Sequence, residues 1–309
     1  MTSRELLYVK TIADEKSITK AAQKLYLTQP SLSHCVSSLE KQLGTRLFRR
    51  TSGGLVLTYA GEKYYRMACE VLRVYAAFES EISEESELLR GRITLGITNY
   101  LGCDLLPRML PRFHREHPGI ELRIIEETTD ELEKSLLSGR LDFAIMHTGA
   151  GDGASEDPGL AHEVLRRDPF LLLAPPDHPY ADRAVSRGGM EDAELDPALL
   201  SGEPFLMVSK GQRIRHVADR VLSQAGFAPQ IVFTSRNFET LRRLCAQGMG
   251  YTFIPRHYIG LLGGEDYRTE CYAIPERYEA FWELSVVTLK DTYLSRAAKA
   301  FLKSFKESI

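Results

Sequence analysis

Residues 17–61 read SITKAAQKLYLTQPSLSHCVSSLEKQLGTRLFRRTSGGLVLTYAG, and this stretch decides the fold of the first part of the chain. Its centre, residues 27–30, is a tight connection between two short helices, because Thr28 can cap the second helix and proline is tolerated in a first turn. The second helix ends at Gly44, and its apolar residues form one stripe at spacings of four and three: Leu32, Val36, Leu39 and Leu43. With another apolar helix upstream, which starts near Leu6, the pattern indicates a helix-turn-helix.

The face of this helix opposite the apolar stripe is polar. At about 100° per residue it carries Pro30, Ser33, His34, Ser37 and Lys41. A solvated outer face is the plainer interpretation, and a face that contacts DNA is the alternative.

A hairpin follows directly, because two short β-prone runs within residues 46–58 flank a Ser-Gly-Gly sequence. Arg49 and Arg50 at its base would point at phosphate if the hairpin were the wing of a DNA-binding domain. An ordinary surface turn would account for the hairpin taken alone. A polar helix face and a basic hairpin on the same segment together favour DNA binding.

The charge of the chain is unevenly distributed. Its 309 residues are 43% hydrophobic and 26% charged, as in an ordinary globular protein of about two domains, and the net charge of −3 taken whole argues against nucleic acid. Residues 1–66 carry +6, however, whereas residues 67–90 carry −4 and the remainder carries −5. A basic head on an acidic body is expected when one end of a chain binds nucleic acid. Chance clustering of solvated charges is the alternative.

Residues 58–89 predict one long helix, because they contain no proline and Gly61 is their only glycine. Apolar residues repeat along this helix at spacings of four and three, as in a heptad seam: Ala60, Tyr64, Met67, Val71, Val74 and Phe78. A single helix cannot bury such a seam. We expect it to pair with a second copy of the chain, since a helix that joins two domains has little of its own body beside it. Packing against that body is the alternative.

The rest of the chain alternates strands and helices, which predicts α/β layers with largely parallel sheets. The expected elements follow one another at residues 92–97, 101–116, 120–126, 131–137, 141–146, 169–174, 205–208, 213–225, 231–234, 239–246, 251–254, 282–289 and 295–306. We therefore predict an all-α-type winged helix-turn-helix domain over residues 1–60, a linker helix over 61–90 and an α/β body of two lobes. The first lobe takes residues 91–164 and 269–309, and the second lobe, residues 165–268, is inserted within it.

Residues 17–61 resemble the N-terminal domain of LysR-type transcriptional regulators. The positions that carry the resemblance fall in the family's order and spacing at residues 21–22, 28–33, 39–40, 43–44, 47–50 and 57–61. The body resembles the family's effector domain more loosely, at residues 90–97, 139–145, 177–179 and 245–255. The resemblance therefore covers nearly the whole chain.

The resemblance implies a transcriptional regulator with a two-lobed, Rossmann-like effector domain of the type 2 periplasmic-binding-protein kind. It implies a homotetramer built as a dimer of dimers on double-stranded DNA with an inverted-repeat operator, and it admits RNA polymerase as a partner. The positions that match DNA contacts of the family or lie on the same helix face are Thr28, Gln29, Pro30, Ser33, His34, Ser37, Arg49 and Arg50. Relatives often carry arginine at position 34, and a neutral histidine offers one donor and one acceptor where arginine forks onto guanine.

In two-lobed α/β domains a small-molecule effector binds at the carboxyl ends of strands, where helix N-termini converge. The effector positions that the resemblance implies, with their neighbours at the same strand ends, are Thr98, Asn99, Tyr100, Thr128, Thr129, His147, Ser209, Arg213 and Asn237. Helix N-termini favour an anionic effector, and a neutral aromatic effector is the alternative. Helix capping and solvated charge are the alternative roles, and Thr128 with Glu131 has the pattern of a capping box.

An enzyme is the first alternative function. Glycines at residues 149–153 superficially resemble a dinucleotide fingerprint, but they precede Asp157, Pro158 and Gly159 rather than a helix. No nucleophile elbow, zinc-protease motif or phosphate-binding loop occurs. His114 and His117 have no partners in the sequence that would complete a metal site. We expect no enzymatic activity, no cofactor and no metal.

Five cysteines bear on the compartment and on a second alternative. Cys35, Cys69, Cys103, Cys245 and Cys271 are odd in number and widely spread, which is typical of reduced thiols in a cytoplasmic protein. A redox-sensing regulator would need a low-pKa thiol beside a resolving cysteine, and Cys103, near a helix N-terminus, is the best candidate. No apolar run reaches the roughly 18 residues of a membrane span, and the start lacks a signal peptide. A ligand-binding protein without a DNA function is the third alternative.

Overall fold

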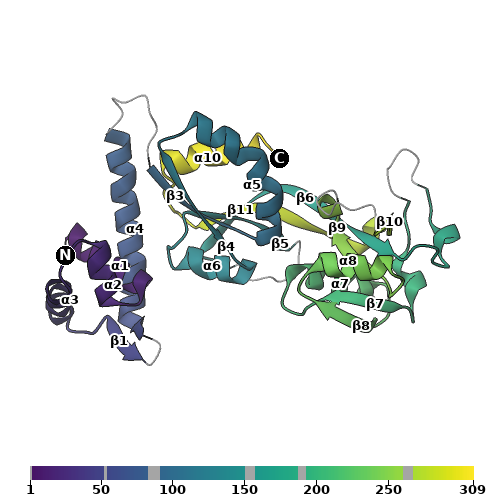
Figure 1. Ribbon diagram of the computed structural model, residues 1–309, viewed down its shortest axis with the longest axis horizontal. Helices are drawn as coiled ribbons and strands as arrows, with labels where there is room; N and C mark the ends of the chain where they lie inside the picture. The colour runs from purple at the N-terminus through teal and green to yellow at the C-terminus, as the bar shows by residue number, and fades with distance from the viewer. Residues whose placement is uncertain (1, 52–53, 83–90, 150–156, 187–192, 260–266) are drawn as a thin grey trace. The chain divides into compact units, whose positions relative to one another are not determined.

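The computed structural model describes residues 2–51, 54–82, 91–149, 157–186, 193–259 and 267–309 (Figure 1). The chain divides into two compact units. The first unit comprises residues 1–144, 158–161 and 287–309, and the second comprises residues 145–157 and 162–286. The lobe boundaries expected between residues 164 and 165 and between 268 and 269 stay predictions.

Three helices form the start of the first unit: α1 (Ser3–Glu15), α2 (Ile18–Lys24) and α3 (Gln29–Leu43). Each follows a residue whose hydroxyl accepts a hydrogen bond from the backbone of the first turn, namely Thr2, Ser17 and Thr28. The predicted stripe of α3 is buried at Leu32 and Val36, among apolar side chains of α1 and α2. The helix-turn-helix predicted from the sequence is confirmed.

A two-stranded hairpin completes this head. Strand β1 (Phe48–Thr51) pairs antiparallel with β2 (Gly54–Leu57), and the tip at residues 52–53 lies outside the described residues. The Glu40 carboxylate at the end of α3 accepts hydrogen bonds from the backbone N–H groups of Leu47 and Phe48, at 2.7 and 3.2 Å. The hairpin is thereby fixed to the helix that precedes it.

The long helix α4 (Tyr59–Ile82) follows the hairpin, and the predicted continuation over residues 83–89 lies outside the described residues. Its N-terminal half packs into the core of the head, where Tyr64 and Ala68 are buried. Further along, Val74 and Phe78 are 51% and 55% exposed. The expected apolar seam is therefore divided: its first half is buried against the rest of the chain, and its second half is exposed to solvent.

Gly61, near the start of α4, lies against the backbone of Leu47, the residue before β1, and this contact leads to a testable prediction. A Cβ atom at this position would lie 2.0 Å from the Leu47 carbonyl oxygen, a backbone atom that cannot move without disturbing the hairpin. We expect Gly61→Ala to lower the free energy of unfolding of the head by about 3 kcal/mol or more. Urea denaturation of the full chain, followed by circular dichroism, measures this loss.

Gly44→Ala is the matched control for this prediction. Gly44 has a positive φ of 67° but open space around it, so alanine there carries only the backbone strain of roughly 1–2 kcal/mol. If the two substitutions lower the free energy of unfolding equally, the contact between an alanine at position 61 and the Leu47 carbonyl oxygen costs nothing, and the prediction is wrong.

The remainder of the first unit is an α/β layer. Strand β3 (Gly91–Ile97) pairs parallel with β4 (Ile120–Glu126), with α5 (Asn99–Glu116) as the crossover. The other elements are α6 (Thr129–Leu137), α10 (Arg296–Lys306), the start of β5 (Phe143–Gly149) and the end of β11 (Phe281–Leu289). Aromatic rings join these elements, since Phe301 of α10 contacts both Phe113 and Phe143.

The second unit contains a parallel pair and an antiparallel group of strands. Its elements are β6 (Leu160–Ala174) from residue 162 onward, β7 (Pro204–Val208), α7 (Arg213–Gln224), β8 (Gln230–Ser235), α8 (Phe238–Ala246), β9 (Thr252–Pro255), α9 (Arg256–Ile259) and β10 (Glu270–Ala273), with short 3-10 turns at Ala181–Arg183, Pro197–Leu200 and Glu276–Tyr278. Strand β7 pairs parallel with β8, as expected. Strand β6 pairs antiparallel with both β9 and β10.

These antiparallel pairs correct the expectation of largely parallel sheets in this part of the chain. The sequence predicted β6 only over residues 169–174, whereas the strand begins at Leu160. Its first half is mostly exposed and includes the charged residues Glu163, Arg166 and Arg167, and such a run lacks the apolar pattern from which a strand is predicted. Strand β10 was missed for a similar reason, because its four residues include the charged Glu270.

Candidate DNA-binding and ligand-binding sites

The predicted DNA-contacting residues of α3 lie on its uncovered side. Thr28 caps α3 and Pro30 lies in its first turn, so the polar face begins at the N-terminal end of the helix. Of the predicted set, Ser33 is half-buried, and the following are exposed: Thr28, Gln29, Pro30, His34 and Ser37. Cys35, on the same helix, is half-buried. The fold thus leaves one continuous polar face of α3 to solvent.

The two arginines of the hairpin are exposed as well. Arg49 is opposite Val56 and Arg50 is opposite Leu55 in the antiparallel register. Because successive side chains of a strand point to opposite faces, these two guanidinium groups leave the hairpin on different sides. The hairpin therefore offers a cation on each of its faces.

In the first unit, the predicted effector residues lie at the starts of α5 and α6. Thr98 precedes α5 as its N-cap, and its side chain makes no capping hydrogen bond. The Thr128 hydroxyl accepts a hydrogen bond from the backbone N–H of Glu131, as its capping role predicts. The Glu131 carboxylate accepts instead from Lys134, at 2.8 Å. Asn99, Tyr100 and Thr129 fall in the first turns of the same two helices.

In the second unit, the predicted residues lie at the starts of α7 and α8. Ser209 follows β7 and Arg213 is the first residue of α7, and both are half-buried. The side-chain oxygen of Asn237 accepts a hydrogen bond from the backbone N–H of Glu239 at 2.9 Å, so its helix-capping role is realised. Arg215, two residues further along α7, is buried and binds Asp219 and the Val208 carbonyl oxygen.

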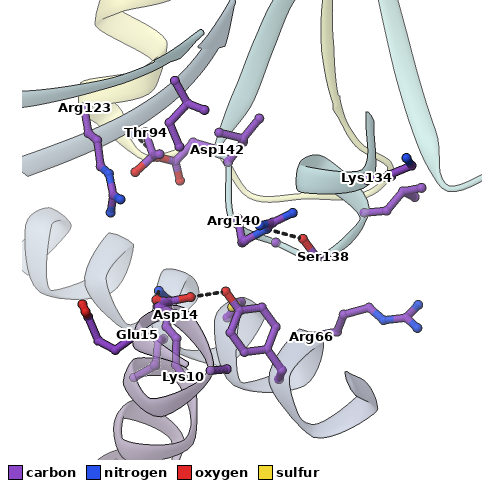
Figure 2. A pocket seen from close by; sticks show the side chains of 18 of the residues that line it. Lys10, Asp14, Glu15, Arg66, Thr94, Arg123, Lys134, Ser138, Arg140 and Asp142 are labelled. Carbon is purple, nitrogen blue, oxygen red and sulfur yellow. Dashed lines mark hydrogen bonds and ion pairs between the residues drawn. The ribbon is translucent and has the colours of Figure 1, made fainter. Parts of the chain in front are cut away.

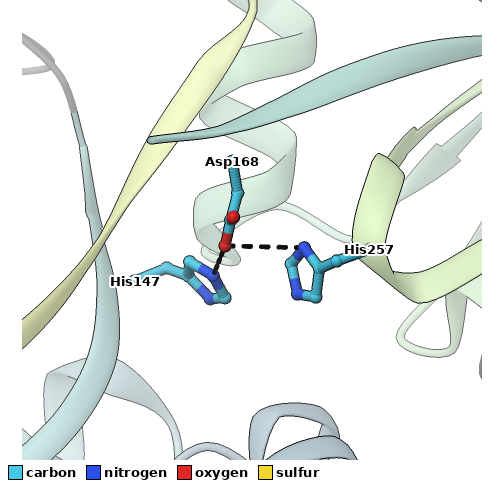
Figure 3. Close-up of side chains that lie close together, drawn as sticks. All are labelled: His147, Asp168 and His257. Carbon is cyan, nitrogen blue, oxygen red and sulfur yellow. Dashed lines mark hydrogen bonds and ion pairs between the residues drawn. The ribbon is translucent and has the colours of Figure 1, made fainter. Parts of the chain in front are cut away.

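His147 is the predicted site residue with the most polar surroundings. Its Nε2 lies 2.9 Å from Oδ2 of Asp168, and Nδ1 of His257 lies 3.5 Å from the same oxygen (Figure 3). The indole ring of Trp282 stacks on the His147 ring, with centroids 3.9 Å apart. All four residues belong to the second unit, on β5, β6, α9 and β11.

The charges in this cluster follow from burial and hydrogen bonding. Burial lowers the pKa of His147 although the carboxylate of Asp168 alone would raise it, so this imidazole is neutral at pH 7. Burial alone would raise the pKa of Asp168, but the hydrogen bond with His147 and the neighbouring His257 and Arg166 lower it. Arg166 contacts the second carboxylate oxygen, Oδ1, at 2.7 Å. The cluster therefore combines neutral His147 with an ionised carboxylate.

Sequence reasoning found His147 and missed its partners. Asp168 and His257 are far from it along the chain, so no short motif with metal-ligand spacing contains them. The only signals were a histidine after a buried strand and a single tryptophan, Trp282, in the whole chain.

A cavity of about 1030 Å³ lies in the first unit and is lined by many charged side chains (Figure 2). Tyr65 donates a hydrogen bond to Asp14 at 2.6 Å, Lys10 pairs with Asp14 at 2.7 Å, and Lys24 pairs with Glu15 at 2.5 Å. Among the described residues that line it, none belongs to the predicted DNA-binding or effector set. The polar groups named here satisfy one another, and the geometry assigns them no ligand.

The head and the body define a class: a DNA-binding winged helix-turn-helix domain joined to an α/β ligand-binding domain. A family model for the bacterial regulatory helix-turn-helix protein of the lysR family matches residues 3–62, and one for the LysR substrate binding domain matches residues 86–309. The chain belongs to the family of LysR-type transcriptional regulators. Among its described residues, no helix is long and apolar enough to cross a membrane.

Several relatives and solved structures are similar along most of the chain. The hydrogen peroxide-inducible genes activator of Dickeya chrysanthemi is 32% identical over 255 residues, which cover 82% of this chain and 79% of that one. The uncharacterized HTH-type transcriptional regulator YcgK of Bacillus subtilis (strain 168) is 27% identical over 318 residues, covering 100% and 95%. A structure of full-length OxyR from Pseudomonas aeruginosa has a TM-score of 0.78 at 26% identity, covering 100% and 94%.

Proposed function

We propose that α3 is the recognition helix of an operator-binding regulator and that the hairpin holds it on the DNA. The observation that carries the proposal is the exposed polar face of α3, because it stands on a segment of residues 1–66 with a charge of +6. Arg49 and Arg50 of the hairpin supply contacts to phosphate, which give affinity and orientation. Gln29, Ser33 and His34 supply contacts to base edges, which give sequence specificity.

His34 allows this assignment to be tested through base preference. Replacement of His34 by arginine places a forked donor at the same exposed position of α3, and such a side chain prefers the O6 and N7 atoms of guanine. We expect His34→Arg to select guanine at one new position in each half-site, with a discrimination of about 1–3 kcal/mol. Selection from a library of randomised duplexes, read by sequencing, measures the preference.

Gln42→Arg is the matched control, since it adds the same charge at an exposed position near the other end of α3. We expect this variant to bind all duplexes somewhat more tightly and to keep the preferences of the natural chain. Identical preferences for His34→Arg and the natural chain would contradict the placement of His34 against the bases.

The regulator acts as an oligomer in this proposal. The uncovered half of α4, with Val71, Val74, Tyr75 and Phe78, pairs with the same helix of a second copy. A second surface is available on β8, an edge strand whose Ile231, Val232 and Phe233 are 38–44% exposed. Two different self-complementary surfaces generate a dimer of dimers, and a two-fold dimer calls for an inverted-repeat operator.

For the effector, we propose a small anion held by residues at the helix starts of the substrate-binding domain. Thr98 and Ser209 contribute hydroxyl groups and Arg213 contributes charge, whereas Thr128 and Asn237 have their side chains engaged in capping. Backbone N–H groups at the starts of α5 and α7 add to the attraction for an anion. We further propose that the regulator acts on promoters in the cytoplasm and that RNA polymerase is a partner.

A peroxide-reactive thiol is the competing kind of signal, because some relatives are named hydrogen peroxide-inducible genes activators. Two of the similar solved structures are of OxyR proteins that carry a mutated cysteine, and this chain has no cysteine between Cys103 and Cys245. Burial raises the pKa of the Cys245 thiol, which opposes thiolate chemistry. These observations favour ligand binding over thiol oxidation.

A further inference from the structure

The cluster of His147, Asp168 and His257 has the composition and the geometry of a metal site. One donor atom from each residue lies within 4.8 Å of the other two. The separations from Oδ2 of Asp168 are 2.9 Å to His147 and 3.5 Å to His257. Ligands about 2.0–2.1 Å from a tetrahedral zinc ion are roughly 3.4 Å apart, so small side-chain adjustments would place one ion between the three donors.

We propose that these three side chains bind a divalent transition-metal ion of the zinc or iron(II) type in the second unit. Two imidazoles and one carboxylate are the ligand set that such ions take when a coordination position is left for water or another ligand. The proposal concerns metal binding alone and does not depend on the proposed operator or anionic effector.

The surroundings hold the three ligands in place. Asp168 is 5% exposed and His147 is 3% exposed, whereas His257 is half-buried and lies on the more open side of the cluster. Arg166 pins Oδ1 of Asp168, which leaves Oδ2 directed between the two imidazole rings, as Figure 3 shows. Outer contacts of this kind orient metal ligands in proteins.

Arg166 also opposes the ion, because its positive charge lies beside the carboxylate. Its side chain is 33% exposed, however, so water screens part of that repulsion. An ion bound at Nε2 of His147 would take the place of the hydrogen bond to Asp168, and the imidazole proton would then reside on Nδ1. The local charge balance therefore permits a dication.

Trp282 gives the site a built-in reporter. It is the single tryptophan of the chain, and it stacks on the His147 ring at an interplanar angle of 11°. Because no other residue contributes tryptophan emission, a paramagnetic ion bound to His147 would quench the whole signal at short range. A change in this emission therefore reports on this cluster and not on a distant site.

The experiment titrates the tag-free full chain, stripped of metal by chelator, with Co²⁺ and then with Zn²⁺. We expect one equivalent of Co²⁺ to quench Trp282 and to produce visible absorption of a four- or five-coordinate site, and Zn²⁺ to reverse both signals. His257→Gln and Asp168→Asn are each expected to weaken Co²⁺ binding about 100-fold or more, judged against losses of 10–100-fold from outer-contact changes alone.

Controls separate this site from other donors. His114→Gln removes an exposed histidine of α5 and is expected to leave the Co²⁺ titration unchanged. A thiolate charge-transfer band in the near ultraviolet would place the ion on cysteine instead, and Cys245→Ser with Cys271→Ser would then abolish it. Circular dichroism without metal checks that the variants fold. If Asp168→Asn does not fold, His257→Gln, which changes the more exposed ligand, provides the test.

Three results would overturn the proposal: no cobalt bound by the natural chain, equal binding by the natural chain and His257→Gln, or a thiolate spectrum. Operator binding by the same samples is measured separately. A chain that binds its operator but no metal would refute the metal site and leave the proposed regulator intact.

Discussion

A chain carrying both Val74→Asp and Phe78→Asp is expected to form an oligomer of half the natural mass and to bind its operator at least about 100-fold more weakly. Both side chains lie on the uncovered half of α4, where they are 51% and 55% exposed in the single chain. Carboxylates there would have to be buried against a second copy, and unpaired buried charge strongly opposes association. Linked binding of two half-sites contributes roughly 10²–10⁴ in affinity, which the variant loses.

Light scattering after gel filtration measures the mass, and titration of a labelled operator measures the affinity. Val164→Asp with Val185→Asp is the matched control, because these valines are 48% and 63% exposed and belong to the second unit rather than to α4. This control is expected to keep both the natural mass and the natural affinity. A double α4 variant with unchanged mass would show that the exposed half of α4 is not an interface.

The division of α4 shows how far periodicity alone reaches. The spacing of Tyr64, Met67, Val71 and Phe78 predicted one seam, because a repeat identifies the face of a helix that is apolar. It does not identify what covers that face. The hairpin and α1 bury Tyr64 within the same chain, and this depends on a tertiary arrangement that the repeat does not encode. The head itself was predictable because its caps, stripe and turn are local in sequence.

The ligand-binding residues were harder to predict for a related reason. Thr128 and Asn237 stand at strand ends and before helices, and the same position suits a helix cap and a ligand contact equally well. The structure shows that Thr128 and Asn237 make capping hydrogen bonds, whereas the sequence left capping and ligand contact as two alternatives. Asp168 was invisible as a partner of His147, because β6 was predicted to begin after it. Long-range pairing of short, charged strands leaves little local signal.

Removal of both hairpin arginines is expected to produce the other large effect. If Arg49 and Arg50 each neutralise one phosphate, Arg49→Ala with Arg50→Ala lowers the salt slope of log K by about 1.8. Extrapolated from 1 M salt, where this electrostatic contribution vanishes, the same loss corresponds to roughly 60-fold weaker binding at 0.1 M. Operator titrations at several salt concentrations give both quantities, and base preference is expected to stay unchanged because phosphate contacts carry no sequence information.

The control removes the same charge elsewhere. Lys303→Ala with Lys306→Ala takes two exposed cations from the end of α10 and is expected to leave the salt slope unaltered. The single variants then divide the effect between the two faces of the hairpin, since Arg49 and Arg50 leave it on opposite sides. A slope that falls by about 0.9 for only one of them would assign the DNA to that face. A double variant with the natural slope would remove the hairpin from the DNA interface and leave α3 to bind alone.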